Sequence, residues 1–352
     1  MTGIRELAIS EAQALWRPET VYLNTATYGL PPQPAWEALQ AALADWHGGR
    51  TSFEGWVPAT ERAREQFALM TGARVDDVVI GANVSGLLGM VAAALPDGTR
   101  VLSADNEFTS LIFPFLAQET RGVRVSFVPL ERLAEAIDAS TGVVAVSAVQ
   151  SSSGAVAALD DIAAAAGHHG ALTVVDASQA LSWLPLDATR FDVVAAHAYK
   201  WLMSPRGTAF MSLDPGLAER VRPHSAGWFA TEDVFGTYYG GPLRLAANAR
   251  RFDTSPAWFN WIATAPALEV INRIGVEAIH EHDVRLANRF RAGLGLPPGD
   301  SAIVSADSPH AEEAFERAGI LASARAGRLR VSFHVYNTDA DVDAALTALK
   351  GV

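Results

Sequence analysis

Two apolar runs that are each followed by a charged side chain constrain the fold of this chain most strongly. Residues 171–175 predict a buried parallel strand that ends in the carboxylate Asp176. Phe191 to Ala196 predict the next strand, and Lys200 follows it closely. The spacing leaves room for a turn and a short helix or loop between these strands. Both charged side chains can therefore meet at the carboxyl edge of one sheet, where open α/β sheets bind ligands.

An amine beside a strand-end carboxylate suits the cofactor pyridoxal 5'-phosphate (PLP). Lys200 would form the Schiff base, and Asp176 would keep the pyridine nitrogen protonated, so that the ring withdraws electrons. Taken singly, such a lysine is more often a solvated surface residue, and such an aspartate is often a helix N-cap. The spacing of the pair and its flanking pattern favour the cofactor interpretation.

Composition limits the other classes of function. The chain has 352 residues, of which 49% are hydrophobic and 19% charged, enough for one large domain or two ordinary ones with a substantial core. A net charge of −12 provides no basic face for nucleic acid. The absence of cysteine removes disulfides, thiolate metal sites and cysteine nucleophiles, and no metal ligands are assigned. Met1 to Ser10 do not resemble a signal peptide, and no run approaches the ~20 apolar residues of a membrane span, so we expect a cytoplasmic protein.

Alternating strands and helices predict an α/β fold with a mostly parallel sheet. The expected strands are Val78–Ile80, Arg100–Ser103, Val123–Val128, Val143–Ala148, Leu172–Val175, Phe191–Ala196 and Thr208–Ser212. The expected helices around them are Glu11–Trp16, Pro34–Trp46, Pro58–Thr71, Leu87–Leu95 and Asp160–His168.

The pattern changes after Leu213. Pro223 to Phe252 read as irregular loops rich in Gly and aromatic residues, which in a compact domain are usually functional. Helices are expected at Pro256–Ile274, Val276–Leu294, Ala311–Ala318 and from Asp339, with strands at Ala302–Ser305 and Leu329–Phe333. We therefore expect a large domain with a seven-stranded-type sheet (residues 15–255) and a smaller C-terminal α+β domain (residues 256–352 with 1–14).

Several further residues follow predicted strands at the same sheet edge. The turn Gly81–Gly86 opens a helix, whose backbone N–H groups and dipole suit a phosphate, and Asn83 and Ser85 can add donors. Phe108 could stack on a planar ring, Gln179 could reach the phenolic oxygen of the cofactor, and His197 could reach the phosphate. Each has an ordinary alternative, respectively a plain turn, a core aromatic, a polar loop residue and a packed histidine.

In order along the chain, four motifs resemble the class V aminotransferase family of fold-type I PLP enzymes. They are Tyr22-Leu23-Asn24-Thr25-Ala26, Asp176-Ala177-Ser178-Gln179, Tyr199-Lys200-Trp201-Leu202, and residues 330–338 (RVSFHVYNT). The family includes cysteine desulfurases, isopenicillin N epimerase-like proteins and C–S lyases. The resemblance covers nearly the whole chain.

The resemblance implies a role for each matching position. Lys200 is similar to the lysine that forms the internal aldimine, Asp176 to the partner of the pyridine nitrogen, and Gln179 to the partner of the ring oxygen. Phe108 takes the stacking position, and His197, Asn83, Val84 and Ser85 take positions near the phosphate. Arg330 matches the arginine that grips the α-carboxylate of an amino-acid substrate, and Ser151 takes the place of an asparagine in the pocket. Apart from the resemblance, we expect Tyr28 to line the pocket for the substrate side chain. Ser255 takes the place of a threonine that reaches the neighbouring subunit's phosphate, so a homodimer is implied.

The departures from the family pattern bear on the reaction. The chain has no cysteine to carry a persulfide, Tyr199 replaces the histidine that desulfurases carry before the lysine, and Phe108 replaces a stacking histidine. Lys200 is then the sole expected proton carrier at Cα. The interpretation we favour is a PLP-dependent β-elimination of C–S lyase type, and the alternatives are aminotransfer or epimerisation of a small amino acid. A binding protein without turnover is a further alternative, against which Lys200, Asp176 and Arg330 argue together.

Overall fold

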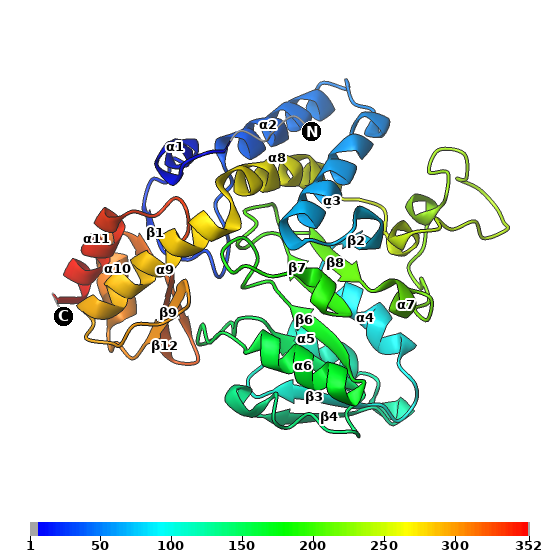
Figure 1. Cartoon of the computed structure of the whole chain (residues 1–352). Helices are drawn as coiled ribbons and strands as arrows, with labels where there is room; N and C mark the ends of the chain where they lie inside the picture. Colours follow the sequence, from blue (N-terminus) through cyan, green and yellow to red (C-terminus); the bar gives the residue numbers. More distant parts are fainter. Residues whose placement is uncertain (1–5, 351–352) are drawn as a thin grey trace.

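A seven-stranded sheet forms the centre of the molecule (Figure 1), in a computed structural model that describes residues 6–350. From edge to edge the strands are β2 (Val78–Gly81), β8 (Ala209–Leu213), β7 (Val193–His197), β6 (Leu172–Asp176), β5 (Val143–Ser147), β3 (Arg100–Ala104) and β4 (Arg124–Val128). β8 runs antiparallel to both of its neighbours, and all other neighbouring pairs are parallel. The prediction of an α/β fold with a mostly parallel seven-stranded sheet is confirmed.

Helices cover both faces of this sheet because alternate strand residues point to opposite sides. One face packs against α4 (Val84–Ala94) and α5 (Thr109–Leu116). The other packs against α3 (Val57–Thr71), α6 (Leu159–His169) and α8 (Trp258–Ile274). The strands other than the edge strand β4 are therefore largely buried on both sides, which explains their mostly apolar sequences.

A smaller α+β part follows α8 and lies at one end of the molecule (Figure 1, orange and red). Its elements are α9 (Val276–Gly293), β9 (Ile303–Ala306), α10 (Ala311–Ala318), β10 (Ile320–Leu321), β11 (Ser323–Arg325), β12 (Arg328–Ser332) and α11 (Asp339–Lys350). β12 lies between β11 and β9 in an antiparallel sheet. Phe290, Phe315 and Val331 belong to the separate core of this part. The expected α+β architecture is thus present.

The N-terminal residues run between these two parts. They form α1 (Ile9–Ala12), β1 (Val21–Tyr22) and α2 (Gln33–His47). β1 pairs in parallel with β10, and α2 and α3 both pack against α8. β1 lies within the range 15–255 that we expected to form the large domain, yet it pairs with a strand of the C-terminal part. The chain therefore passes between the two parts more often than one boundary at residue 255 implies. Those limits stay a prediction, and residues 1–5 and 351–352 lie outside the described part of the chain.

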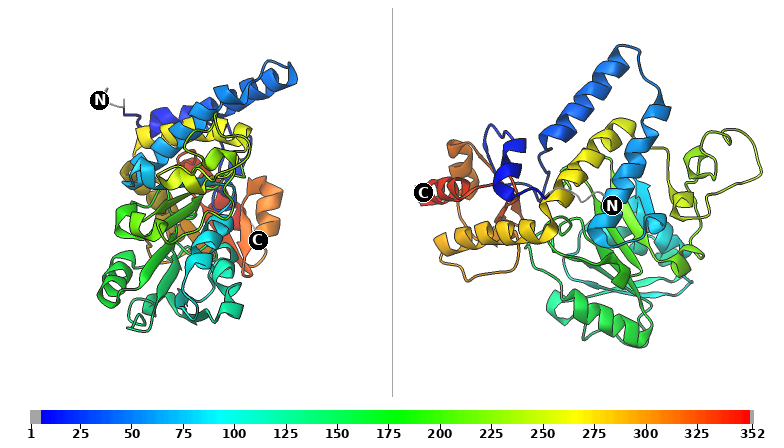
Figure 2. Two further views of the ribbon diagram at one scale, coloured as in Figure 1. Left: turned by 90° about the vertical axis from the view of Figure 1, so that its right-hand side faces the viewer. Right: turned by 45° about the horizontal axis from the view of Figure 1, so that its top comes forward.

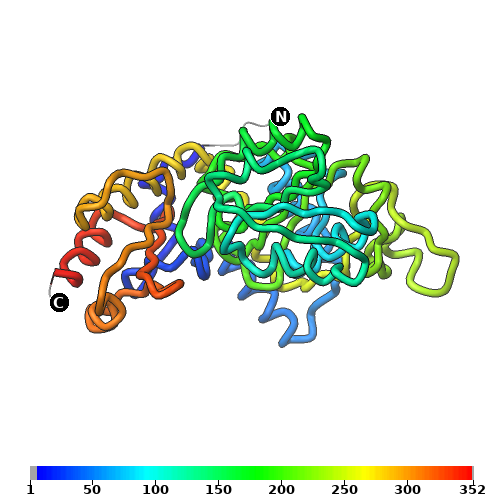
Figure 3. The backbone as a smooth tube through the Cα atoms, turned by 90° about the horizontal axis from the view of Figure 1, so that it is seen from below, coloured from blue at the N-terminus to red at the C-terminus, as the bar shows by residue number. Residues whose placement is uncertain are grey.

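The segment 223–252 carries little regular structure and projects at the end of the molecule away from the C-terminal part (Figures 2 and 3). The remaining helix is α7 (Pro215–Ala218). Short 3₁₀ helices lie at Gln13–Leu15, Phe53–Gly55, Val75–Asp77, Glu119–Arg121, Leu130–Arg132, Ala188–Arg190, Trp228–Ala230 and Ala249–Phe252. Within residues 6–350, no helix is both long and apolar enough to cross a bilayer.

The structure corrects the predicted elements at a few places. The N-terminal helix begins at Ile9 and passes into a 3₁₀ turn instead of running from Glu11 to Trp16. The helix expected from Pro256 begins at Trp258. The sequence prediction missed α5, which contains Pro114 and carries apolar residues on its exposed side as well, so its sequence shows no amphipathic period. It also missed β10 and β11, which are too short to show a periodic pattern.

Candidate active site

The carboxyl ends of β6 and β7 bring Asp176 and Lys200 to the same region. β6 ends at Asp176, which pairs in register with Ala195 of β7, and Lys200 follows the end of β7 by three residues. Only 3% of Asp176 and 6% of Lys200 is exposed. A carboxylate and an amine are therefore both held out of water at the edge where the parallel strands end.

The surroundings of Lys200 favour its neutral form. Burial lowers the pKa of Lys200 to about 8, although the carboxylate of Asp176 opposes this shift. The guanidinium groups of Arg330, Arg325 and Arg206 lower the pKa further. With a pKa near 8, about one-tenth of the amine is neutral at pH 7. A fraction of this size can act as a nucleophile or as a base.

Asp176 is a buried carboxylate with few partners of its own. It accepts one hydrogen bond, from the backbone N–H of Ser178 at 2.8 Å. No ion pair to Asp176 occurs among residues 6–350. A buried carboxylate is costly without a cationic or hydrogen-bonding partner. The site therefore favours a ligand that brings a protonated nitrogen to this position.

The start of α4 forms an anion-binding geometry. Asn83 is the N-cap, and its Oδ1 accepts hydrogen bonds from the N–H of Gly86 (2.7 Å) and the hydroxyl of Ser85 (3.0 Å). In the described part of the chain, the backbone N–H of Ser85 makes no hydrogen bond. The helix dipole adds partial positive charge, so this end of α4 suits a phosphate.

His197 fastens the start of α4 to the sheet. Its Nε2 accepts a hydrogen bond from the N–H of Val84 at 3.2 Å, so in the neutral ring the proton lies on Nδ1, which contacts the hydroxyl of Ser178 at 3.2 Å. Burial lowers the pKa of His197 to about 4, although Asp176 opposes this shift. His197 is thus held as a neutral acceptor, and its predicted contact with a phosphate stays a prediction.

Phe108 lies beside the lysine amine. The distance between Nζ of Lys200 and the centre of the Phe108 ring is 5.2 Å, and 42% of Phe108 is exposed. Glu107, the preceding residue, accepts hydrogen bonds from the N–H (2.8 Å) and hydroxyl (2.5 Å) of Ser147 and from Nε2 of Gln150 (2.8 Å). These bonds attach the loop that carries Phe108 to the end of β5. Burial raises the pKa of Glu107, and its hydrogen bonds oppose that shift.

Gln179, Ser151 and Arg330 form a connected polar group. Nε2 of Gln179 donates to the hydroxyl of Ser151 at 3.1 Å, and Nη1 of Arg330 donates to the carbonyl oxygen of Ser151 at 2.6 Å. Nη2 of Arg330 donates to the hydroxyl of Thr27 at 2.7 Å. Only 2% of Arg330 is exposed. The strand β12 of the C-terminal part thus delivers a buried guanidinium to the end of the large sheet.

Two predicted site residues lie at the margins of this group. The ring of Tyr28 packs against Tyr199, with 5.5 Å between ring centres, and its hydroxyl accepts from the N–H of Arg206 at 2.9 Å. Ser255 is exposed and lines a small cavity of about 50 Å³ with Gly81 and Gly207, away from the Arg330 group. Within one chain, Ser255 therefore takes no part in the contacts around Lys200.

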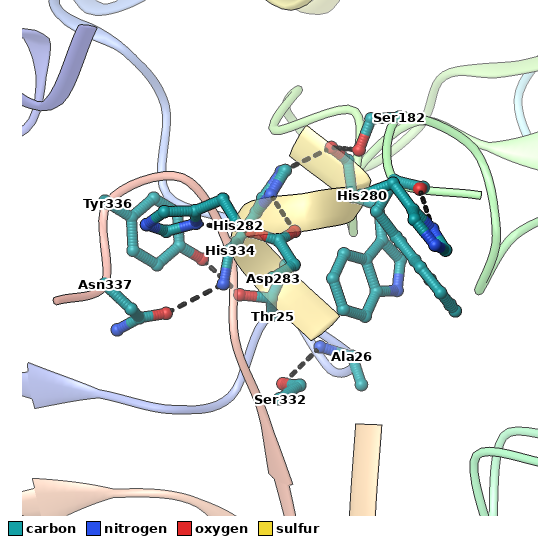
Figure 4. A network of polar contacts seen from close by, with 12 residues as sticks. Thr25, Ala26, Ser182, His280, His282, Asp283, Ser332, His334, Tyr336 and Asn337 are labelled. Carbon is teal, nitrogen blue, oxygen red and sulfur yellow. Dashed lines mark hydrogen bonds and ion pairs between the residues drawn. The ribbon is translucent and has the colours of Figure 1, made fainter. Parts of the chain in front are cut away.

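A buried polar network holds the residue after Lys200 (Figure 4). His334 contacts Oδ2 of Asp283 through Nδ1 (3.1 Å) and the carbonyl oxygen of Trp201 through Nε2 (3.0 Å). The other oxygen of Asp283 contacts Nδ1 of His282 at 2.9 Å. Asp283 and His334 are fully buried. Helix α9, the segment after β12 and the lysine segment are therefore joined at one point.

Sequence reasoning missed several residues that complete the site: Glu107, Thr27, Arg325, Asp283 and His334. Glu107 carried a usable signal, because it follows a predicted strand at the same sheet edge as Phe108. Thr27 and Arg330 are far apart in the sequence, and their contact depends on the packing of the C-terminal part on the large sheet. No local pattern encodes that contact.

The residues at this sheet edge fit PLP. The fit rests on the donor set: an amine with a lowered pKa, a buried carboxylate without an ion pair, and a helix N-terminus with a free N–H group. These groups suit, in that order, the aldehyde, the ring nitrogen and the phosphate of the cofactor. The fold and these groups define the class of a PLP-dependent enzyme.

Comparison with known proteins agrees with this class. The model of the aminotransferase class-V family matches residues 21–314, so the chain belongs to that family, whose members are PLP-dependent enzymes. An uncharacterized aminotransferase, YcbU, from Bacillus subtilis is 29% identical over 88% of this chain and 89% of its own length. The isopenicillin N epimerase of Streptomyces clavuligerus is 27% identical over 97% of this chain and 98% of its own.

The fold is also similar to solved structures. The cystine C–S lyase C-DES, in complex with its reaction product cysteine persulfide, superposes with a TM-score of 0.83 at 21% identity, over 94% of this chain and 97% of that one. At this identity the likeness concerns the fold.

Proposed function

We propose that the protein is a PLP-dependent lyase that eliminates a thiol from an S-substituted cysteine. The observation that carries this proposal is that the ring beside the amine of Lys200 is that of Phe108, which cannot carry a proton, at the position where desulfurases carry a histidine. The chain also has no cysteine that could take up sulfur as a persulfide. The sulfur of the substrate therefore leaves in the product.

Each predicted residue has a task in this proposal. Lys200 would hold PLP through its amine, Asp176 would face the ring nitrogen, and Gln179 would face the ring oxygen. Asn83, Val84 and Ser85, at the start of α4, would hold the phosphate, and Phe108 would stack on the ring. Arg330 would bind the α-carboxylate of the substrate beside Ser151, and Tyr28 would line the pocket. When bound, PLP supplies an electron-withdrawing ring that stabilises negative charge at Cα of an amino acid.

Water is the only further reactant that the elimination requires. Once the amino group of the substrate has displaced the amine of Lys200 from the cofactor, Lys200 would remove the proton from Cα of the substrate. The bond between Cβ and sulfur breaks, and its electron pair leaves with the sulfur, which takes up a proton to become a thiol. The three-carbon fragment, released as 2-aminoacrylate, reacts with water to give pyruvate and ammonium.

Product analysis of the PLP-loaded enzyme with S-propyl-L-cysteine tests this function. We expect one pyruvate for each free thiol, without an added oxo-acid, and no turnover by the Lys200→Ala variant. Amino-group transfer that depends on an added oxo-acid would establish the alternative named by the YcbU relative, aminotransfer. Formation of the D-amino acid without thiol release would establish epimerisation, the activity named by another relative.

The proposal extends to assembly and location. A homodimer would allow Ser255 of each subunit, which lies outside the Arg330 group of its own chain, to reach the partner's phosphate site. A cytoplasmic location stays part of the proposal, and residues 1–5, part of the N-terminal segment expected not to be a signal peptide, lie outside the described residues.

A further inference from the structure

Two arginines converge on one hydroxyl beside the lysine without an acidic partner. Nη2 of Arg330 and Nη2 of Arg325 both donate to Oγ1 of Thr27, at 2.7 Å and 3.2 Å. The other acceptors of Arg330 are the carbonyl and hydroxyl of Ser151 and the hydroxyl of Ser323. All of these acceptors are neutral. Neither guanidinium forms an ion pair with any residue between 6 and 350.

Arg328, on the same hairpin, differs from Arg325 and Arg330 because it has an acidic partner. Arg328 lies directly opposite Arg325 in the β11–β12 register and forms an ion pair with Asp307 at 2.7 Å. Opposite residues in an antiparallel pair project from the same face of the sheet. Arg325, Arg328 and Arg330 therefore share one face, on which Arg328 is neutralised and the other two arginines are not.

The register fixes the separation of the two unpaired arginines. Arg330 lies opposite Ser323, and Arg325 is two residues further along β11, so Arg325 and Arg330 are diagonal neighbours. Such positions have Cα atoms about 7–8 Å apart. Arg330 is buried, whereas Arg325 is exposed at the end of the hairpin. The pair thus consists of a buried guanidinium, Arg330, and an exposed one, Arg325.

The positive charge of Arg325 and Arg330 affects pKa values at the site. Burial lowers the pKa of Arg330 to about 10, and the charge of Arg325 lowers it further. Arg325 also lowers the pKa of Lys200. Two guanidinium groups that share a neutral acceptor repel each other, and a ligand with negative charge at both ends would remove this repulsion.

We propose that Arg325 binds a second acidic group, carried on the side chain of the substrate, while Arg330 binds the α-carboxylate. This inference rests on the proposed function for the identity of the scissile bond. The preferred substrates are then S-substituted cysteines whose sulfur substituent ends in a carboxylate or a similar anion. Arg325 is the exposed member of the pair, so it would meet the anion of the substrate side chain while the buried Arg330 holds the α-carboxylate.

The first test compares two substrates of similar length on the PLP-loaded enzyme, S-(2-carboxyethyl)-L-cysteine and S-propyl-L-cysteine. We expect kcat/KM to be higher for the carboxylated substrate. In Arg325→Gln this preference falls by roughly two- to fivefold, mainly through KM, which is the range for an exposed charged contact. Arg325→Lys retains part of the preference because it keeps the charge and loses the fork. Arg328→Gln, which removes the same charge from the same hairpin, leaves the preference unchanged.

A binding test separates this inference from the proposed function. Calorimetric titration with glutarate and with pentanoate, which lack an amino group and cannot react, measures the preference for two acidic groups directly. We expect tighter binding of glutarate, lost in Arg325→Gln and kept in Arg328→Gln. If that pattern holds while no S-substituted cysteine releases a thiol, the second anion position stands and the lyase function is wrong.

Two outcomes would overturn the inference. One is equal binding of glutarate and pentanoate together with equal kcat/KM for the two cysteine derivatives. The other is an equal loss of kcat/KM for both derivatives in Arg325→Gln, because Arg325 would then assist Arg330 at the α-carboxylate.

Discussion

Lys200 owes its reactivity to burial, and this has a measurable consequence at the scale of one residue. Since burial lowers its pKa to about 8, the neutral fraction of the amine rises about tenfold per pH unit below pH 8 and levels off above it. The rate at which apoprotein captures PLP, followed by visible absorbance, should show the same dependence, because only the neutral amine is a nucleophile. A midpoint near 10.5, the ordinary value for lysine, would contradict the burial seen here.

Glu107 provides a second test at this scale. Its carboxylate accepts from the backbone N–H of Ser147, and Glu107→Ala removes this acceptor. A buried donor left without an acceptor costs about 1–3 kcal/mol. We expect urea denaturation to show a loss of that size, together with weaker PLP binding, because the loop that carries Phe108 loosens. The exposed Glu131→Ala should leave both unchanged. Unaltered stability of Glu107→Ala would remove its anchoring role.

The sequence predicted those residues whose position follows from strand ends. Asp176, Lys200 and Phe108 follow parallel strands, and such strands bring their carboxyl ends to one edge of the sheet. Thr27 escaped this reasoning because it meets Arg330 only after the C-terminal part packs against the rest of the chain. A contact between the two parts of the molecule depends on tertiary packing, so no local sequence pattern indicates it. Arg325 escaped it because its strand, β11, has only three residues and shows no periodic pattern.

At the scale of elements, Asp283 joins α9 to the segments that carry His334 and Trp201. Nε2 of His334 faces the carbonyl oxygen of Trp201, which can only accept, so this nitrogen carries a hydrogen. Nδ1 of the same ring faces Oδ2 of Asp283, and that contact requires a second hydrogen between the two atoms. Asp283→Ala leaves two imidazoles without this partner. We expect the free energy of unfolding to fall by about 1–3 kcal/mol, the cost of leaving a buried hydrogen-bonding group without its partner.

A companion variant separates packing from hydrogen bonding at Asp283. Asp283→Asn can donate its NH₂ group to Nδ1 of His334 and so keep the bond to the carbonyl of Trp201. We therefore expect it to lose less stability than Asp283→Ala and to keep more of kcat. Equal behaviour of both variants in urea denaturation and in kinetics would mean that the network does not position the lysine segment.

Helices and strands were easier to predict from the sequence when they were long and showed a clear periodic pattern. All seven strands of the main sheet were expected from the sequence, because each is a mostly apolar run of four or five residues. β1 and β10 have two residues each, and their pairing depends on the return of the C-terminal part to the N-terminal segment. Short strands of this kind are stabilised by tertiary contacts and carry little local signal.

At the scale of the whole molecule, large apolar side chains remain exposed on the projecting segment 223–252. Tyr239 is 91% exposed, Leu243 is 76% exposed, and Phe235 is 47% exposed. Exposed apolar groups gathered on one segment are typical of protein interfaces. The same end of the large sheet carries Ser255, which would contribute to the partner's phosphate site in the proposed homodimer.

This arrangement predicts that assembly and cofactor binding are linked. The double variant Tyr239→Asp/Leu243→Asp places two charges in the proposed interface, and desolvating them there is unfavourable. We expect sedimentation to show a dimer for the unaltered protein and a monomer for the variant. PLP should dissociate more readily from that monomer, because Ser255 of the partner is lost from the phosphate site. Leu69→Asp changes an exposed leucine on α3 and should leave the dimer intact. A monomeric unaltered protein that binds PLP tightly would show that one chain completes the phosphate site by itself.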